Sequence, residues 1–355
     1  MRLDIVSKYR NQLYGFAILW VVVFHAWAIV EVDYSFGHSS GALSWLATVL
    51  ETGNVGVDIF LFLSGICLFF SFSKDGDIGR FMKKRLMRIF IPLWIINGLY
   101  WSVRILVAGG DLEGFISRVL LLRFWLTGDS SCWYGSLIVL LYFMYPFFYK
   151  FIYSDRAKHP LVRCLLLMAL FYFVCVATKH SMPDVYKAVE IALTRIPVFV
   201  FGVYFGKLVH DKKRLGNGLV VVLCFVAAVL FFAAMHYDLI DSKMLWRFSY
   251  LIGGVSLSYA LCYCFEGIDR LCNSRQSLLL RFFSWLGGFS FELYLSHITI
   301  IQIYRLTEVY SPGQGNLIPY FVGIVPAAIL VAWAGGKLTT RIISLATSRA
   351  RKSEV

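Results

Sequence analysis

The sequence predicts an all-α polytopic membrane protein, with about ten transmembrane helices in one bundle. Of its 355 residues, 59% are hydrophobic and 15% are charged, whereas soluble domains are roughly half apolar and about a quarter charged. One soluble core of this size could not enclose the surplus, so apolar side chains must face lipid. The apolar residues also gather in long runs, and a transmembrane helix needs about 20 consecutive residues of this kind.

Ten runs reach or approach this length. The most apolar is 217–236, the one at 161–178 is short, and the one at 132–152 contains Pro146, which a membrane helix tolerates when its neighbours satisfy the freed carbonyl group. The first run follows a segment of mixed charge and is too long for the apolar core of a signal peptide, so we expect it to be a retained helix. The predicted segments are 13–31, 53–73, 86–108, 132–152, 161–178, 192–209, 217–236, 247–265, 282–304 and 318–345.

The distribution of Lys and Arg gives the orientation of these segments. If the N-terminus faces the cytoplasm, about three quarters of the 34 basic residues fall on the cytoplasmic side, as the positive-inside rule requires. An even number of helices then places both termini in the cytoplasm. We predict one transmembrane domain over residues 1–345 and a basic cytoplasmic tail over 346–355. The net charge of +13 follows from this bias, so we expect no nucleic-acid partner.

Ionisable side chains inside a membrane are costly, and we treat them as functional candidates. His25 lies in the first run, Asp58 in the second, and Glu292 and His297 in the ninth. At about 1.5 Å of rise per residue, the two histidines reach a similar depth in the outer part of the membrane. Asp58, which is near the outer start of its helix, and Trp133 lie at the same level.

The ninth segment also carries a polar face. Ser290, Tyr294 and His297 are spaced i, i+4 and i+7, which places them on one side of a helix. The rest of the segment is apolar. We therefore expect this face to look into a protein cavity rather than toward lipid.

A dense basic cluster precedes the third segment, in the stretch RFMKKRLMRIFIP that contains Arg85 and Arg88. Positive-inside bias, together with attraction to anionic lipid, is one explanation. The other is a phosphate-binding site, since the guanidinium group suits bidentate contact with phosphate. The sequence leaves both explanations open.

Four blocks of sequence, in this order, resemble acyltransferase family 3, a family of membrane proteins. They are LYGFAILWVVVFH, which ends in His25; GNVGVDIFLFLSG, which contains Asp58; FMKKRLMRIFIP, the basic segment; and GGFSFELYLSH, which ends in His297. A weaker fifth block is CWYGSLIVLLYFMYP, which contains Trp133. The blocks are spread over most of the chain.

The resemblance implies transfer of an acyl group, often acetyl, from cytoplasmic acyl-CoA to a hydroxyl group of a sugar or another cell-surface acceptor. It also implies a catalytic role for His25. Family members usually have Arg or Lys eleven residues before that histidine, where this sequence has Tyr14. Arg10 lies one helical turn earlier on the same face, so we expect it to substitute. The acyl-CoA phosphates would then rest on Arg10, Arg85 and Arg88.

His25 is our candidate for the general base, because a neutral imidazole can take the proton of an attacking hydroxyl group near neutral pH. An acyl-histidine intermediate and a purely structural histidine are the alternatives. Asp58 either orients His25 or accepts hydrogen bonds from the backbone at the start of its helix. His297 binds the acyl carbonyl group or the acceptor, or has a structural role.

The remaining candidates line the predicted pocket or hold the helices together. Because Gly65 follows Ser64, we expect close helix packing at this position rather than a nucleophilic role for Ser64. Glu292 contacts the acceptor or ties two helices. Ser290 and Tyr294 face the pocket. Trp133 belongs to the interfacial aromatic belt or stacks on a sugar.

A different class of function stays open. Ten helices with intramembrane His, Asp and Glu could form a transporter or a flippase for a lipid-linked sugar or a small metabolite. We expect the plasma (inner) membrane of a bacterial cell, a lipid bilayer around the protein, and no permanently bound cofactor. The eight cysteines form no CxxC pair or zinc-like cluster, so we expect no metal.

Overall fold

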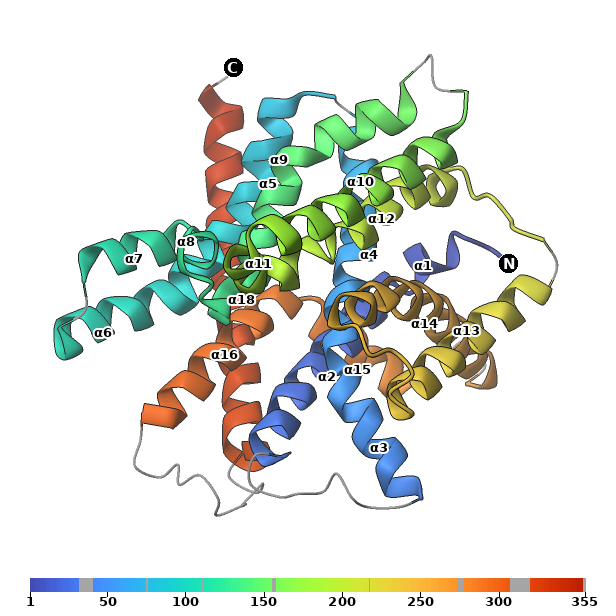
Figure 1. Ribbon diagram of the computed structural model, residues 1–355. Coiled ribbons are helices and arrows are strands. Elements are labelled where there is room, and N and C mark those ends of the chain that lie inside the picture. Colours follow the sequence, from blue (N-terminus) through green and yellow to red (C-terminus); the bar gives the residue numbers. More distant parts are fainter. Residues whose placement is uncertain are drawn as a thin grey trace.

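The computed structural model describes residues 1–31, 41–74, 76–109, 111–154, 158–216, 218–272, 277–306 and 320–353, and in these ranges the protein is all-α (Figure 1). One isolated bridge joins Arg2 to Arg214. The α-helices are α1 (Ile5–Lys8), α2 (Arg10–Glu31), α3 (Ala42–Glu51), α4 (Val55–Phe72), α5 (Ile78–Leu93), α6 (Leu99–Ala108), α7 (Leu112–Val119), α8 (Arg123–Thr127), α9 (Trp133–Tyr153), α10 (Pro160–Ser181), α11 (Pro183–Leu193), α12 (Ile196–His210), α13 (Leu219–His236), α14 (Lys243–Leu271), α15 (Leu278–Gly287), α16 (Ser290–Leu306) and α18 (Val325–Ser353).

Eight helical stretches among the described residues are long and apolar enough to cross a membrane. Each coincides with one of the predicted segments, from the second to the eighth and the tenth. The prediction of an all-α polytopic membrane protein is therefore confirmed. The stretches are Ser44–Phe72, Ile78–Val107, Ser130–Tyr153, Pro160–Ser181, Pro183–His210, Leu219–His236, Lys243–Leu271 and Val322–Ala346.

The two remaining predicted segments are the first and the ninth. The first is α2, which runs without interruption from Arg10 to Glu31. The ninth, 282–304, is not one helix, because α15 ends at Gly287 and α16 begins at Ser290. The prediction of a continuous ninth helix was therefore wrong.

Main-chain contact with α2 accompanies this break. A Cβ atom on Gly287 would lie 1.9 Å from the carbonyl oxygen of Asn11, and one on Gly15 would lie 1.9 Å from the carbonyl oxygen of Phe283. Only glycine permits such an approach, since any larger residue would push the two helices apart. Helix α15 is thus bound closely to the start of α2, and the chain turns at Gly288 before it continues as α16.

The third predicted segment contains a second irregularity. Helix α5 leads through Pro92 into a π-helical turn, η3 (Trp94–Gly98), and then into α6. Proline removes a backbone donor from a helix, and π-turns often mark functional sites. The turn brings Asn97 into the interior, where its Nδ2 atom donates to Oγ1 of Thr299 on α16 at 2.7 Å.

The core forms around α2 and α4, which pack against each other and against α12, α14, α15 and α16. A Cβ atom on Gly65 would lie 2.5 Å from the carbonyl oxygen of Phe199, and one on Gly202 would lie 2.3 Å from that of Phe62. Close helix packing at Gly65 is therefore confirmed. Membrane helices commonly approach each other through such small residues.

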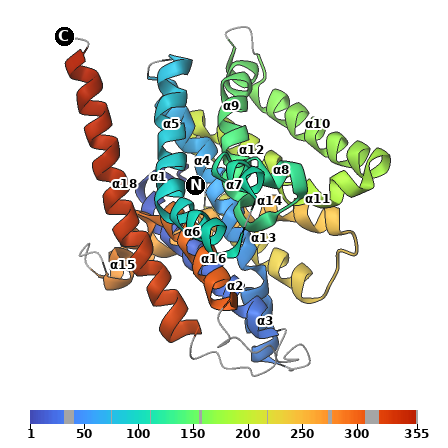
Figure 2. The same cartoon turned by 90° about the vertical axis from the view of Figure 1, so that its left-hand side faces the viewer.

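Helices α10, α13 and α18 have large exposed apolar surfaces and lie at the periphery, with α10 and α18 at opposite sides of the molecule (Figure 2). Their outward side chains, which include Leu166, Phe173 and Val229, would face lipid. Helix α18 continues without a break to Ser353 and so includes most of the predicted basic tail.

Candidate active site

Two imidazole rings meet inside the bundle, one from α2 and one from α16. The ring centroids of His25 and His297 lie 5.1 Å apart, with an angle of 61° between the ring planes. The two residues are far apart in the sequence, and the prediction that they share a level is confirmed as direct contact.

The same hydrogen bond holds each ring. Nδ1 of His25 lies 2.9 Å from the carbonyl oxygen of Val21, and Nδ1 of His297 lies 2.9 Å from that of Leu293. A carbonyl oxygen can only accept, so each Nδ1 carries the proton that is donated. In a neutral ring this leaves a lone pair on Nε2, which is the form required of a general base.

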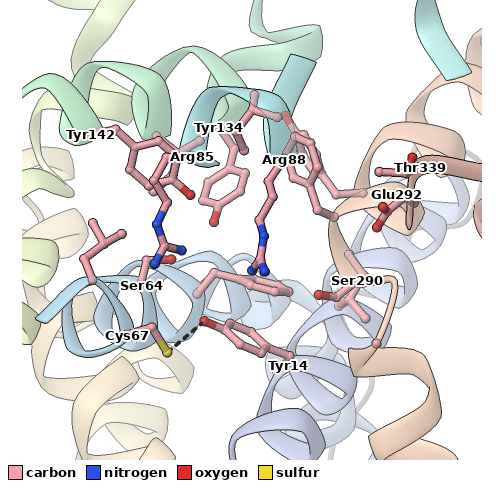
Figure 3. Close-up of a pocket in the computed structure, with 18 of the residues that line it drawn as sticks. Tyr14, Ser64, Cys67, Arg85, Arg88, Tyr134, Tyr142, Ser290, Glu292 and Thr339 are labelled. Carbon is pink, nitrogen blue, oxygen red and sulfur yellow. Dashed lines mark hydrogen bonds between the residues drawn. The ribbon is translucent and has the colours of Figure 1, made fainter. Parts of the chain in front are cut away.

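A cavity of about 550 Å³ opens between α2, α4, α5, α9, α16 and α18 (Figure 3). Six residues that were predicted as site residues line it: Ser64, Arg85, Arg88, Ser290, Glu292 and Tyr294. They come from α4, α5 and α16. The other lining residues are Tyr14, Ile18, Val21, Val57, Phe60, Cys67, Leu68, Ile89, Tyr134, Ile138, Tyr142, Gly288, Phe291, Thr339, Thr340, Ile343 and Ser344.

The faces of α2 and α16 that line the cavity continue to the histidine pair. On α2 the cavity residues Ile18 and Val21 are followed on the same face by His25. On α16 the cavity residue Tyr294 is followed by His297, and their ring centroids are 6.0 Å apart. The two histidines therefore lie one helical turn beyond the lining of the cavity.

Arg85 and Arg88 project from α5, and their guanidinium groups point into the space near Ser64 and Tyr14 (Figure 3). The other basic residues of the cluster, Arg80, Lys83 and Lys84, are exposed and lie outside the cavity lining, whereas Arg88 is exposed but belongs to the lining. The cluster is therefore divided. Two arginines line a cavity, while the other three basic residues lie outside it, where the positive-inside bias by itself accounts for them.

The N-terminus of α5 is fixed by Asp77. Its Oδ1 atom accepts from the backbone N–H of Arg80 at 2.9 Å. This hydrogen bond is the main cause that lowers the pKa of the Asp77 carboxyl group, and the charge of Arg80 adds to it. An aspartate at this position is a favourable helix cap, and it begins the helix that carries both cavity arginines.

Near the start of the first helix, Tyr14 reaches the cavity and Arg10 does not. The hydroxyl oxygen of Tyr14 lies 3.8 Å from Sγ of Cys67 (Figure 3). Arg10 is exposed, and its Nε atom donates to Oδ1 of Asn11 at 3.4 Å. Arg10 does not belong to the cavity lining, so the structure does not support the predicted substitution.

Asp58 is paired with a residue that the sequence analysis did not select. Its Oδ2 atom accepts from Nε of Arg195 at 3.3 Å, and the two side chains are 0% and 1% exposed. The structure thus gives Asp58 an arginine partner in place of the predicted contact with His25. The carboxylate instead joins α4 to the start of α12.

Trp133 covers the guanidinium group of Arg195. The Cζ atom of Arg195 lies 5.1 Å from the ring centroid of Trp133 and 5.3 Å from that of Tyr250. Cation–π contacts of this kind help to compensate a buried positive charge. The contact with Arg195 was not among the roles predicted for Trp133, which were the interfacial belt and the sugar platform.

Glu292 lines the cavity near Thr339 of α18 (Figure 3). Among the described residues it forms no ion pair, so the structure gives no support to a role in tying helices by charge. Ser64 also faces the cavity, although its neighbour Gly65 is the residue that permits close packing.

Sequence reasoning missed Arg195, Asn97 and Thr339. A signal existed for Arg195, because it lies within the predicted sixth segment and so satisfied the rule that selected Asp58. Asn97 and Thr339 carry no charge, so the rule for ionisable side chains did not select them. Only the turn at η3 and the position of α18 reveal them.

Comparison with known proteins identifies the family. A family model described as an acyltransferase domain matches residues 11–337. The chain is also similar to acyltransferase MdmB of Streptomyces mycarofaciens, with 22% identity over 291 residues, which are 72% of this chain and 70% of the relative. No solved structure matches. The match to the family model extends over nearly the whole chain, from the first helix into α18, and the protein therefore belongs to acyltransferase family 3.

Proposed function

We propose that this acyltransferase moves an acyl group, most simply acetyl, from cytoplasmic acyl-CoA to a hydroxyl group of an extracytoplasmic sugar or cell-surface polysaccharide. The observation that carries the proposal is the cavity itself. It has two arginines in its wall and leads along α2 and α16 to a pair of histidines.

The cavity has a wall with two arginines and a space between helices, which suit the two parts of coenzyme A. Coenzyme A has a phosphate-rich head and a thin flexible arm. Arg85 and Arg88 supply planar guanidinium groups that can bind phosphate through two hydrogen bonds each. The volume of about 550 Å³ lies within the usual range of small-molecule sites. The arm would extend between α2, α4 and α16 toward the histidine pair.

His25 then acts as the general base. Its Nε2 atom takes the proton of the acceptor hydroxyl group while the hydroxyl oxygen attacks the thioester carbonyl carbon. The carbon–sulfur bond breaks, and the proton passes from the imidazole to the leaving thiolate. The alternative route, through an acyl-histidine, forms the same products in two transfers.

Membrane vesicles of defined orientation test the proposal. Acetyl-CoA labelled in the acetyl group cannot cross the bilayer, so we expect label on glycans inside inverted vesicles and none on right-side-out vesicles. Vesicles with the His25→Ala variant at the same protein level are the control. If inverted vesicles with the intact protein gain no labelled glycan above the control, the proposed reaction is wrong. Movement of a sugar without acylation would instead support transport.

A further inference from the structure

Two buried polar atoms on one face of α16 have no hydrogen-bond partner among the described residues. They are the hydroxyl oxygen of Tyr294 and Nε2 of His297, which belong to side chains that are 7% and 1% exposed. Buried polar groups in proteins are nearly always paired, and an exception at a cavity is a candidate for contact with substrate. The two atoms differ in chemistry, because the hydroxyl group can donate and Nε2, as the structure holds the ring, can only accept.

Tyr294 lies between the cavity and the histidine pair. It belongs to the cavity lining, and its ring centroid is 6.0 Å from that of His297. Its ring meets Tyr134 edge-on at 5.3 Å and stacks on Phe291 at 6.0 Å with an angle of 26°. Contacts with three aromatic rings restrict the movement of the phenol, so the hydroxyl group keeps a defined position.

Acyl transfer needs a hydrogen-bond donor at this place. When the acceptor oxygen adds to the thioester, the carbonyl oxygen becomes negatively charged, and a donor held in advance stabilises it. The rings of His25 and His297 both present Nε2 lone pairs, because both Nδ1 protons are already donated to backbone carbonyl groups. The histidines can therefore take protons but cannot supply this hydrogen bond. Tyr294 has the donor that they lack.

We propose that Tyr294 is a catalytic residue whose hydroxyl group donates a hydrogen bond to the thioester carbonyl oxygen and to the oxyanion that forms from it. The inference rests on the proposed acyl-CoA-dependent reaction. Tyr294 keeps its proton throughout, while the proton of the acceptor hydroxyl group travels through Nε2 of His25 to the thiolate. The negative charge returns from the oxyanion to the carbon–oxygen double bond as the carbon–sulfur bond breaks.

The test is the Tyr294→Phe variant, which removes one oxygen atom and keeps the aromatic contacts. We expect kcat for acetyl transfer to fall by about 10²- to 10³-fold, the usual effect of losing one oxyanion donor. The KM for acetyl-CoA should change by less than about threefold. Tyr145→Phe is the matched control, because Tyr145 is 0% exposed, has an unpaired hydroxyl group and lies outside the cavity lining.

Infrared spectroscopy gives a second measurement that does not depend on turnover. Acetonyl-CoA, a ketone in which a methylene group replaces the thioester sulfur, is labelled with ¹³C at its carbonyl group and bound to each protein. We expect its carbonyl stretch to lie at lower frequency in the wild type and the Tyr145→Phe control than in Tyr294→Phe. The same frequency in all three proteins, or kcat unchanged in Tyr294→Phe, would overturn the role of Tyr294. Absence of acetyl-CoA-dependent transfer by the wild type would overturn the proposed function itself.

Discussion

The Nε atom of Arg195 lies 3.3 Å from Oδ2 of Asp58, and both side chains are completely enclosed by the bundle. Removal of one member of a buried ion pair leaves an uncompensated charge and typically costs about 3–5 kcal/mol. We therefore expect Arg195→Met to lower the thermal unfolding temperature in detergent markedly. The Arg195→Met/Asp58→Asn double variant should recover part of the loss.

The exposed pair Asp77 and Arg80 serves as the control, with an oxygen–nitrogen distance of 3.2 Å. Exposed ion pairs contribute little to stability because water screens them. Arg80→Met should leave the unfolding temperature nearly unchanged. If Arg195→Met and Arg80→Met were equally stable, the pair at Asp58 would have no structural role.

The second prediction concerns His25, the proposed general base. We expect His25→Ala to lower acyl transfer by about 10²- to 10⁴-fold, the usual contribution of a general base, while the protein still inserts and melts normally. His210→Ala is a suitable control, since His210 is exposed and contacts Asp211. Transfer of labelled acetyl groups to surface glycans is the measurement. Undiminished transfer by His25→Ala would show that His25 is structural.

The third prediction separates the two halves of the basic cluster. Charge-assisted hydrogen bonds contribute about 1.5–3 kcal/mol each, so Arg85→Ala and Arg88→Ala should raise the KM for acetyl-CoA by at least about tenfold. Lys83→Ala and Lys84→Ala change exposed residues of the same helix and should leave KM unchanged. Equal effects at all four positions would favour general membrane electrostatics over a phosphate site.

The fourth prediction concerns the contact between α2 and α15. Gly15→Ala would place a methyl group 1.9 Å from the carbonyl oxygen of Phe283. We expect this variant to unfold at lower temperature and to lose acyl transfer, because the helix that carries His25 must shift. Gly267→Ala in α14 meets open space and should be neutral or slightly stabilising, since alanine favours helices over glycine. Equal melting of the two variants would contradict a close contact.

The sequence predicted the helices and the contents of the cavity more successfully than the connections between them. Long apolar runs position membrane helices through hydrophobicity alone, and the polar face of α16 follows from helical spacing. The partner of Asp58 could not be found in this way, because Arg195 is 137 residues away and their contact depends on α4 and α12 being neighbours. The turn at Gly288 was missed for a related reason. Glycine is common within straight membrane helices, and only the contact with Asn11 distinguishes this break.

The hydrogen bonds from the histidine rings to Val21 and Leu293 have a consequence for how the site is maintained. In many hydrolases a carboxylate from elsewhere in the chain sets the tautomer of the catalytic histidine. Here the donor and the acceptor are four residues apart on one helix, at both histidines. The orientation of each ring is thus a product of helical periodicity. Because each Nδ1 hydrogen bond stays within one helix, that bond moves with its helix as a unit when the bundle shifts.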